Sequence, residues 1–154
     1  MKNSITILGP RLQDIGGFDN KSVNNDIIKS ILNILKKHPK STLLTSASVG
    51  IEMWSAEAAV SLKIPIELVI PCNGFESKWP ISVQKSYAII RSQSKVTVLS
   101  EEPWSGKLML AKDKYLHDSA NIVYHFYGVT PKFIDRNKAF GVLGEIDNEF
   151  FLSL

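Results

Sequence analysis

Residues 45–59 read TSASVGIEMWSAEAA and join a strand signal to a helix signal. The apolar pair Leu43 and Leu44 precedes them, and the alanines and glutamates of the second half favour a helix. Gly50 therefore falls at the first helical turn, since inside the helix it would cost about 1 kcal/mol relative to alanine. The small residues in between predict a tight turn whose N–H groups form a candidate anion cradle. A turn without a ligand is the competing interpretation, because short Gly/Ser loops have low specificity.

The composition is that of one globular domain. The 154 residues fit a single domain covering 1–154. The sequence contains 44% hydrophobic and 21% charged residues, and this composition excludes disordered, collagen-like and coiled-coil chains. No apolar run approaches the roughly 20 residues of a membrane span, and the first residues lack the apolar segment of a secretory leader. The single cysteine, Cys72, suits a reducing compartment. We therefore expect a cytoplasmic protein with no membrane partner.

The charge balance points toward small anions. The net charge of +3 is mild, and the lysines are scattered along the chain. This suits an anionic small molecule and falls short of the basic stripe of a dedicated duplex binder. A small phosphate-bearing molecule is the expected partner, and nucleic acid is the less favoured alternative.

Strand and helix signals alternate along the chain. We expect strands at residues 4–8, 43–45, 64–70, 96–99 and 122–126. We expect helices at residues 23–38, from the turn near residue 50 onward, and at 80–92, 107–118 and 131–140. Ser22 is the expected N-cap of the first helix, and Pro131 suits the first turn of the last. Five strand-then-helix repeats predict an α/β, Rossmann-like three-layer sandwich, a mostly parallel sheet with helices on both faces.

The chain after Gly141 gives weaker signals. Residues 142–146 are compatible with a further edge strand. The apolar side chains within residues 150–154 are expected to dock on their own domain. A contact within a homodimer or higher oligomer is the alternative interpretation of the same residues.

Ligands of parallel sheets bind beyond the carboxyl ends of the strands. That rule selects four loops, which we expect at one edge of the sheet: residues 9–17, 46–50, 72–79 and 128–131.

Seven residues of the opening stretch match a known motif. The pattern S-x-x-x-G-x-[DE]-x-W-x-A-E-x-A is carried by Ser46, Gly50, Glu52, Trp54, Ala56, Glu57 and Ala59. The chain thereby resembles the SLOG superfamily of Rossmann-like nucleotide-binding proteins, and within it the YpsA-like group related to the DNA-processing protein DprA. Further matches follow in order at Gly9, Arg11, Gly16, Gly17, Pro71, Trp79, Gln84, Tyr87, Met109, Asp118 and residues 128–130.

The chain departs from its relatives at two places. Lys112 and Asp113 stand where relatives tend to carry Arg-Asn, and Val129 stands where they carry a glycine. A β-branched valine disfavours positive φ and narrows access to the loop. We therefore expect a ligand that differs from the usual one of the family.

The predicted ligand-binding residues come from these loops and the matched motif. They are Gly9, Arg11, Ser46, Ala47, Ser48, Val49, Gly50, Glu52, Trp79, Gly128, Val129 and Thr130.

Each role has a structural alternative. Arg11 would grip a phosphate through two parallel hydrogen bonds, or form a salt bridge. The turn at 46–50 would hold phosphate oxygens, and Thr130 would build a second, facing cradle unless it only caps its own helix. Glu52 would accept hydrogen bonds from ribose hydroxyls or complement the helix dipole. Trp79 would stack on a base or belong to the core.

No catalytic residue, metal ligand or required cofactor is predicted. Cys72 has no evident Cys-His-Asn set around it, and a lone cysteine usually serves as a small apolar filler. His38, His117 and His125 lack the spacing of metal ligands. Nucleophilic and metal-dependent catalysis are both weakly supported.

Three functions remain open. The leading one is a sensor, carrier or sequestering module for a nucleotide-type ligand; the resemblance implies signals such as ADP-ribose derivatives and a setting in phage or bacterial defence. The resemblance also implies a nucleoside-monophosphate N-glycosidase like the LOG branch, although the P-G-G-x-G-T-x-x-E motif is missing after Gly128. The third is single-stranded DNA binding like DprA, with Arg11, Lys78, Lys107 and Lys112 as candidate cations.

Overall fold

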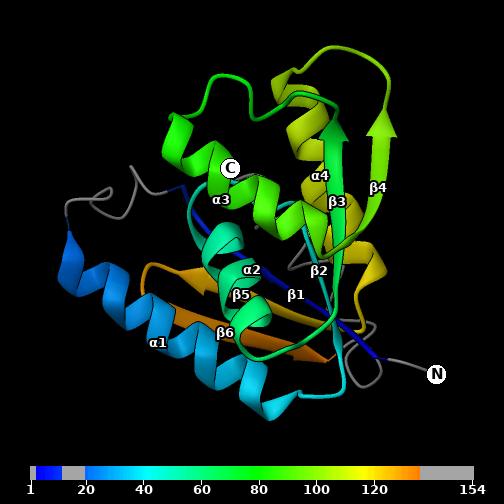
Figure 1. The fold of residues 1–154 in the computed structure, drawn as a ribbon. Helices are drawn as coiled ribbons and strands as arrows, with labels where there is room; N and C mark the ends of the chain where they lie inside the picture. Colours follow the sequence, from blue (N-terminus) through cyan, green and yellow to red (C-terminus); the bar gives the residue numbers. More distant parts are fainter. Residues whose placement is uncertain (1–2, 12–19, 136–154) are drawn as a thin grey trace.

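The computed structural model describes residues 3–11 and 20–135. The strands are β1 Ser4–Leu8, β2 Thr42–Thr45, β3 Ile66–Cys72, β4 Lys95–Ser100, β5 Ile122–Tyr127 and β6 Thr130–Asp135. The helices are α1 Lys21–Lys37, α2 Ile51–Ser61, α3 Ile81–Ser92 and α4 Gly106–Ser119. Strand and helix alternate through β5, as the sequence predicts (Figure 1).

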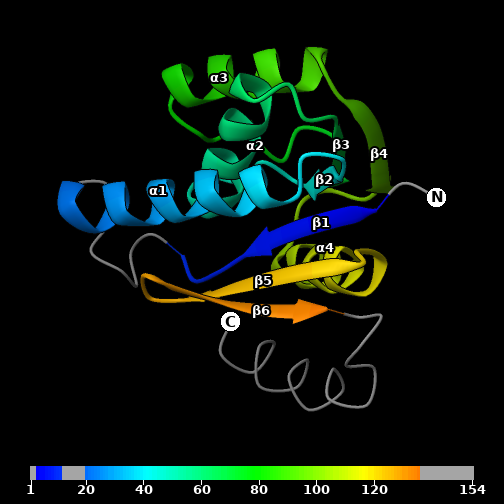
Figure 2. The same cartoon turned by 90° about the horizontal axis from the view of Figure 1, so that it is seen from below.

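One six-stranded sheet organises the fold, in the order β4-β3-β2-β1-β5-β6. Strands β1 to β5 are parallel, and β6 pairs with β5 in the antiparallel sense. Helices α1, α2 and α3 lie on one face of the sheet and α4 lies on the other (Figure 2). The predicted Rossmann-like α/β architecture, a mostly parallel sheet with helices on both faces, is confirmed.

Alternating strand residues build a core on each face of the sheet. Ile5 and Ile7 of β1 are fully buried in the larger cluster, beneath the layer of α1 and α2. Leu8 packs on the opposite face, in a smaller cluster with Leu116 of α4. Because successive strand side chains point to opposite faces, one strand feeds both layers. This two-sided burial fixes the register of the central strands and therefore the positions of the loops at their carboxyl ends.

The last predicted helix is wrong. Residues 130–135 form the strand β6, and the loop of Gly128 and Val129 joins it to β5 in a tight hairpin. Gly128 has φ +61° and Val129 is not among the positive-φ residues, the pattern of a type II′ turn, which suits hairpins. Pro131 lies opposite Phe126 in this edge strand, a position that tolerates proline because its missing N–H can face away from the sheet.

Two other sequence predictions need comment. The N-cap of α1 is Asn20, whose side chain accepts a hydrogen bond from the Val23 amide, and not Ser22, which lies inside the helix. The double glycine Gly16–Gly17, the predicted strand at 142–146 and the apolar tail at 150–154 lie outside the described residues.

Candidate functional site

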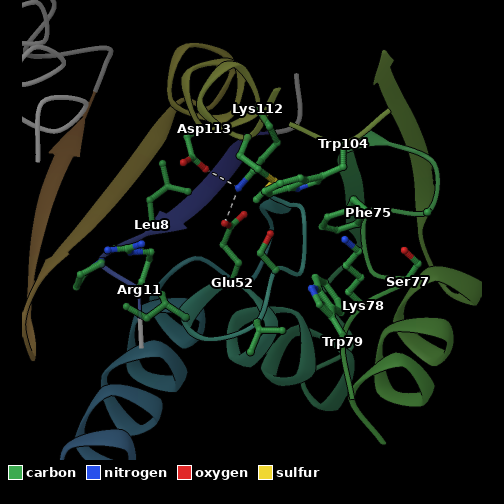
Figure 3. A pocket seen from close by; sticks show the side chains of 17 residues that line it. Leu8, Arg11, Glu52, Phe75, Ser77, Lys78, Trp79, Trp104, Lys112 and Asp113 are labelled. Atoms are coloured by element: carbon green, nitrogen blue, oxygen red, sulfur yellow. Dashed lines mark hydrogen bonds and ion pairs between the residues drawn. The ribbon is translucent and has the colours of Figure 1, made fainter. Parts of the chain in front are cut away.

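A pocket of about 670 Å³ lies at the carboxyl ends of the parallel strands. Its walls come from the end of β1, the bend before α2, the loop after β3, the loop after β4 and the first half of α4. The volume falls in the range of small-molecule sites, roughly 300–1,000 Å³. Figure 3 shows Arg11 on one side, the aromatic side chains on the opposite side, and three charged side chains between them.

The bend between β2 and α2 is held by its own side chains. The Ser46 amide and hydroxyl each donate to Glu52 Oε1 at 3.0 Å, and the Ala47 amide donates to Thr45 Oγ1 at 3.1 Å. The Ser48 amide donates to Ser46 Oγ at 3.3 Å, and the two serine hydroxyls lie 2.5 Å apart. Ser46, Ser48, Val49 and Gly50 were expected to offer N–H groups and hydroxyls to a phosphate, but the amides of Ser46, Ala47 and Ser48 already have partners within the bend.

The open part of the bend is its last two residues. Gly50 is the N-cap of α2 and supplies no side-chain cap, so the first helical amides have no partner of that kind. In the described part of the chain, no hydrogen bond from the amide of Val49 or Gly50 to another group is found. Of the predicted bend, these two residues therefore keep amides that are available to an anion, and anion binding there stays a prediction.

The bend also stores backbone strain. Ala47 has φ +54°, which is uncommon for a residue with a side chain, and Gly50 has φ 112° and ψ −134°. For a residue with a side chain, such as Ala47, this conformation costs about 1–3 kcal/mol and persists only where surrounding contacts enforce it, whereas glycine adopts positive φ freely. Glu52 and Thr45 provide those contacts, because both accept hydrogen bonds from the strained segment.

A buried lysine in the lining of the pocket joins the two helical layers. Lys112 of α4 is 1% exposed, and its Nζ donates to Glu52 Oε2 at 2.8 Å and to Asp113 Oδ1 at 2.5 Å. Glu52 belongs to α2 on the opposite face of the sheet. Its carboxylate is therefore engaged on both oxygens, by Ser46 on one and by Lys112 on the other.

The cluster of Glu52, Lys112 and Asp113 contains more acidic than basic groups. Burial disfavours the charged form of Lys112, but the carboxylates of Glu52 and Asp113 outweigh it and raise the pKa of the ammonium. Burial raises the pKa of Asp113, and the neighbouring Glu52 carboxylate raises it further, against the opposing effect of Lys112. With both carboxyls ionised the cluster has one negative charge in excess.

Aromatic side chains form the wall opposite Arg11. Phe75, Trp79 and Tyr87 meet edge to face, with ring centroids 5.0–5.6 Å apart. Phe75 is buried and Trp79 half-buried, so this group extends the core to the rim of the pocket. Trp104, from the loop after β4, is 57% exposed and lines the same pocket. An exposed indole beside a pocket is suited to stacking on a planar ligand.

The structure brings part of the predicted site together. Six predicted residues line the pocket: Gly9, Arg11, Ser48, Val49, Glu52 and Trp79. Ser46 and Ala47 are fully buried behind the bend, and Gly50 is buried at the start of α2. Whether any of these residues contacts a ligand stays a prediction.

The hairpin residues do not line the pocket. Gly128, Val129 and Thr130 are exposed at the end of β5 and are not among the lining residues. Thr130 is the first residue of β6 and not the N-cap of a helix, so it forms no second anion cradle. The expected pair of facing cradles is wrong, because the chain turns back as a strand at this point.

Other singled-out residues are structural. Cys72 is buried in the larger core cluster, consistent with a small apolar filler. His38 Nε2 lies 3.1 Å from Tyr124 Oη, and the buried rings of His117 and His125 lie 5.1 Å apart. Burial, helped by His117, lowers the pKa of His125 to about 3.

Within residues 3–11 and 20–135, no group of three or more His, Cys, Asp or Glu side chains is placed to hold a metal ion. The same ranges contain no helix long and apolar enough for a membrane span.

Several pocket residues were not selected from the sequence. Trp104 lies in the loop after β4 and Met109 in the first turn of α4, so both follow the carboxyl end of a parallel strand. Lys112 and Asp113 were noted as departures from relatives, and Lys112 also as a candidate cation for DNA, but neither was predicted to line a small-molecule pocket. Their convergence with Glu52, sixty positions away in the case of Lys112, depends on the packing of α4 against the sheet and has no local signal.

The fold and the pocket define a Rossmann-like protein with a ligand site at the carboxyl edge of its sheet. The sequence profile described as the YspA SLOG family matches residues 5–132. The chain belongs to this family, which confirms the resemblance predicted from the motif.

The curated relatives are UPF0398 proteins. Those of Brevibacillus brevis, Lactobacillus delbrueckii subsp. bulgaricus and Oenococcus oeni are 24%, 27% and 23% identical to this chain. The alignments cover 88%, 66% and 71% of this chain and 80%, 60% and 64% of those proteins. The chain thus spans less than two thirds of the latter two relatives.

One solved structure shares the fold. DNA processing protein A (DprA) from Streptococcus pneumoniae superposes with a TM-score of 0.55 at 15% identity. The match covers 80% of this chain and 41% of that protein. At this identity the likeness establishes the architecture alone.

Proposed function

We propose that this protein binds a nucleotide or nucleotide-derived phosphate ligand, such as an ADP-ribose-type molecule, in the pocket beside Arg11 and the start of α2. The observation that carries the proposal is the order of chemistry along the pocket. A guanidinium and an uncapped helix start lie on one side, and aromatic rings lie on the other. A nucleotide has the same order, with anionic phosphate at one end and a planar base at the other.

The phosphate end combines two attractive features. Arg11 is exposed on the rim, and a guanidinium can donate two parallel hydrogen bonds to a phosphate. The amides at the start of α2 add the positive end of the helix dipole, which favours an anion by about 0.3–2 kcal/mol. Gly9, directly before this rim, has no side chain to obstruct it.

The base end offers a stacking surface. Trp104 is largely exposed, and Trp79 is fixed by its contacts with Phe75 and Tyr87. Stacking of a base on an aromatic side chain contributes about 1–3 kcal/mol. Lys78 on the same side adds a cation that suits a second phosphate of a dinucleotide-type ligand.

Isothermal titration calorimetry with AMP, ADP-ribose, NAD and cyclic nucleotides tests the proposal, with adenosine and inorganic phosphate as partial ligands. We expect at least one nucleotide to bind more tightly than either partial ligand. Arg11→Ala should weaken that binding, whereas Lys114→Ala, which removes an exposed lysine of α4 outside the pocket, should not. A panel with no heat of binding and no rise in unfolding temperature would contradict the proposal.

DNA binding is the second candidate function. The shared fold with DprA favours it, as do two exposed cations, Lys78 in the pocket lining and Lys107 at the start of α4. Lys112, however, is buried in ion pairs and contributes no cation to a groove, contrary to the sequence expectation. A gel-shift titration of single-stranded DNA at two salt concentrations decides between the candidates, because phosphate contacts give steep salt dependence.

Hydrolysis of the ligand is tested with the same samples. Asp113 is a carboxyl in a pocket with a raised pKa, the type of group that acid–base chemistry uses. Release of ribose 5-phosphate from AMP would assign the chain to N-glycoside hydrolysis, and AMP recovered intact would restrict it to binding.

A further inference from the structure

The charged cluster in the middle of the pocket presents one acceptor that the protein leaves unused. Glu52 is engaged on both oxygens, by Ser46 and Lys112. Asp113 uses only Oδ1, toward Lys112, and within the described ranges no donor is found for its Oδ2. Asp113 lines the pocket with its side chain 17% exposed, so this carboxylate is open to a ligand.

We propose that Asp113 accepts a hydrogen bond from a sugar hydroxyl of the bound nucleotide, so that the pocket selects ribonucleotides over their deoxy counterparts. This inference rests on the proposed function, and it transfers to Asp113 the role that the sequence gave to Glu52. Glu52 instead positions the bend, because Ser46 and Lys112 hold its carboxylate in place.

Charge decides which part of a ligand lies against Asp113. The cluster of Glu52, Lys112 and Asp113 contains two carboxyls and one ammonium, and the ammonium already donates to both carboxyls. A phosphate at this point would face like charge with no cation left to neutralise it. A neutral hydroxyl group, in contrast, supplies the hydrogen that a carboxylate accepts.

The position of Asp113 in the pocket determines which hydroxyl groups of a bound nucleotide it can contact. Figure 3 shows Asp113 and Lys112 between Arg11 on one side and Trp104 on the other. A nucleotide with its phosphate at Arg11 and its base at Trp104 places its sugar between the two. The 2′- and 3′-hydroxyls are the donors that the sugar offers there.

Burial makes the contact selective. Lys112 is fully buried, which keeps the cluster rigid, and Asp113 loses little mobility when a ligand arrives. A ligand that lacks the hydroxyl would displace water from the Asp113 carboxylate and offer no hydrogen bond in its place. Sites built to bond a hydroxyl reject the analogue without it for this reason.

Calorimetry with AMP, 2′-deoxy-AMP and 3′-deoxy-AMP on the wild-type protein is the primary test. We expect AMP to bind about 10-fold or more tightly than at least one deoxy analogue, the factor that loss of one charge-assisted hydrogen bond gives. If AMP binds and both deoxy analogues bind as tightly, the inference is wrong while the proposed function stands. If no nucleotide binds at all, the proposed function fails and the inference fails with it.

Substitution of Asp113 tests whether this residue causes the selectivity for ribose. Asp113→Asn keeps the shape and removes the charge, and it should bring the affinities for AMP and the deoxy analogue to within about 3-fold, at a similar affinity for the analogue. The matched control is Glu57→Gln, an exposed carboxylate of α2 outside the pocket, which should keep the wild-type ratio. A ratio unchanged in Asp113→Asn would overturn the assignment. If that variant does not fold, Asp113→Ser is measured in its place, and the wild-type comparison still decides whether the pocket selects ribose.

Discussion

Replacement of Lys112 by methionine isolates the energetic role of the buried ion cluster. Methionine keeps a four-atom apolar stem, with sulfur in place of one methylene, and removes the ammonium. The variant leaves the carboxyls of Glu52 and Asp113 close together, with side chains 12% and 17% exposed and no counter-charge. The perturbation therefore removes one partner of a buried pair and creates no large cavity.

The expected loss is large for a domain of this size. Removing one partner from a buried ion pair costs about 3–5 kcal/mol, because the remaining charge keeps its desolvation penalty. At about 2–4 °C per kcal/mol for chains of 150 residues or more, this predicts a fall in unfolding temperature of roughly 6–20 °C. Total stabilities are about 5–15 kcal/mol, so the variant should remain folded with a reduced margin.

The loss should depend on pH in a defined direction. Without Lys112 the folded-state pKa of Asp113 rises further above its value in the unfolded chain, because burial and the Glu52 carboxylate raise it and the opposing ammonium is gone. The native state then binds protons more tightly, and its stability falls as pH rises through that interval. We expect a smaller loss relative to wild type at pH 5 than at pH 8.

Urea denaturation of wild type and variant at both pH values measures the effect. Lys114→Met is the control, since Lys114 is exposed on the same helix, and we expect it to change stability by less than about 0.5 kcal/mol. A loss below about 1 kcal/mol at pH 8, or the same loss at both pH values, would refute the reasoning that Lys112 compensates buried carboxylates.

Three further substitutions test the geometry of the pocket. Gly50→Ala should destabilise the fold by about 1–3 kcal/mol in urea denaturation, because φ 112° is strained for any residue with a side chain, and an unchanged midpoint would argue against this backbone conformation. Gly9→Ala should cost about 1–3 kcal/mol in the same assay, since the new Cβ would lie 2.5 Å from Ile51 Cδ1 and 3.0 Å from Phe126 Cβ. Trp104→Ala should leave the stability within about 0.5 kcal/mol, because the side chain is largely exposed, yet weaken AMP binding by about 5- to 150-fold in calorimetry. Equal affinity in that variant would remove Trp104 from the site.

The parallel part of the fold is predictable from local sequence, and its last turn is not. The short apolar runs of β1, β2, β3 and β5 mark strands, because strands covered by helices on both faces are apolar nearly throughout. The segment from Thr130 to Asp135 contains a proline that suits a helix start or an edge strand equally well. Pairing with β5 decided between them, and its local signal is the two-residue turn Gly128–Val129, which was interpreted as a ligand loop.

The candidate site, like the fold, is predictable from the sequence only in part. Arg11, Ser48, Val49 and Trp79 were predicted from their place after a strand, and all four line the pocket. The amides of Ser46 and its neighbours were expected to be open, but Glu52 and Thr45 occupy them through hydrogen bonds that sequence periodicity does not encode.

The ion pair between Glu52 and Lys112 could not be predicted from the sequence either. It joins helices on opposite faces of the sheet, and neither residue has a local signal that would indicate the other.

The central claim is that a phosphate lies between Arg11 and the start of α2. A titration of AMP into isotopically labelled protein, followed by the amide resonances of its NMR spectrum, tests it most directly. We predict that the amides of Val49 and Gly50 and the indole resonance of Trp104 shift together and saturate at one concentration. Unchanged amides at Val49 and Gly50 under saturating AMP, or shifts confined to the hairpin around Gly128, would contradict the account.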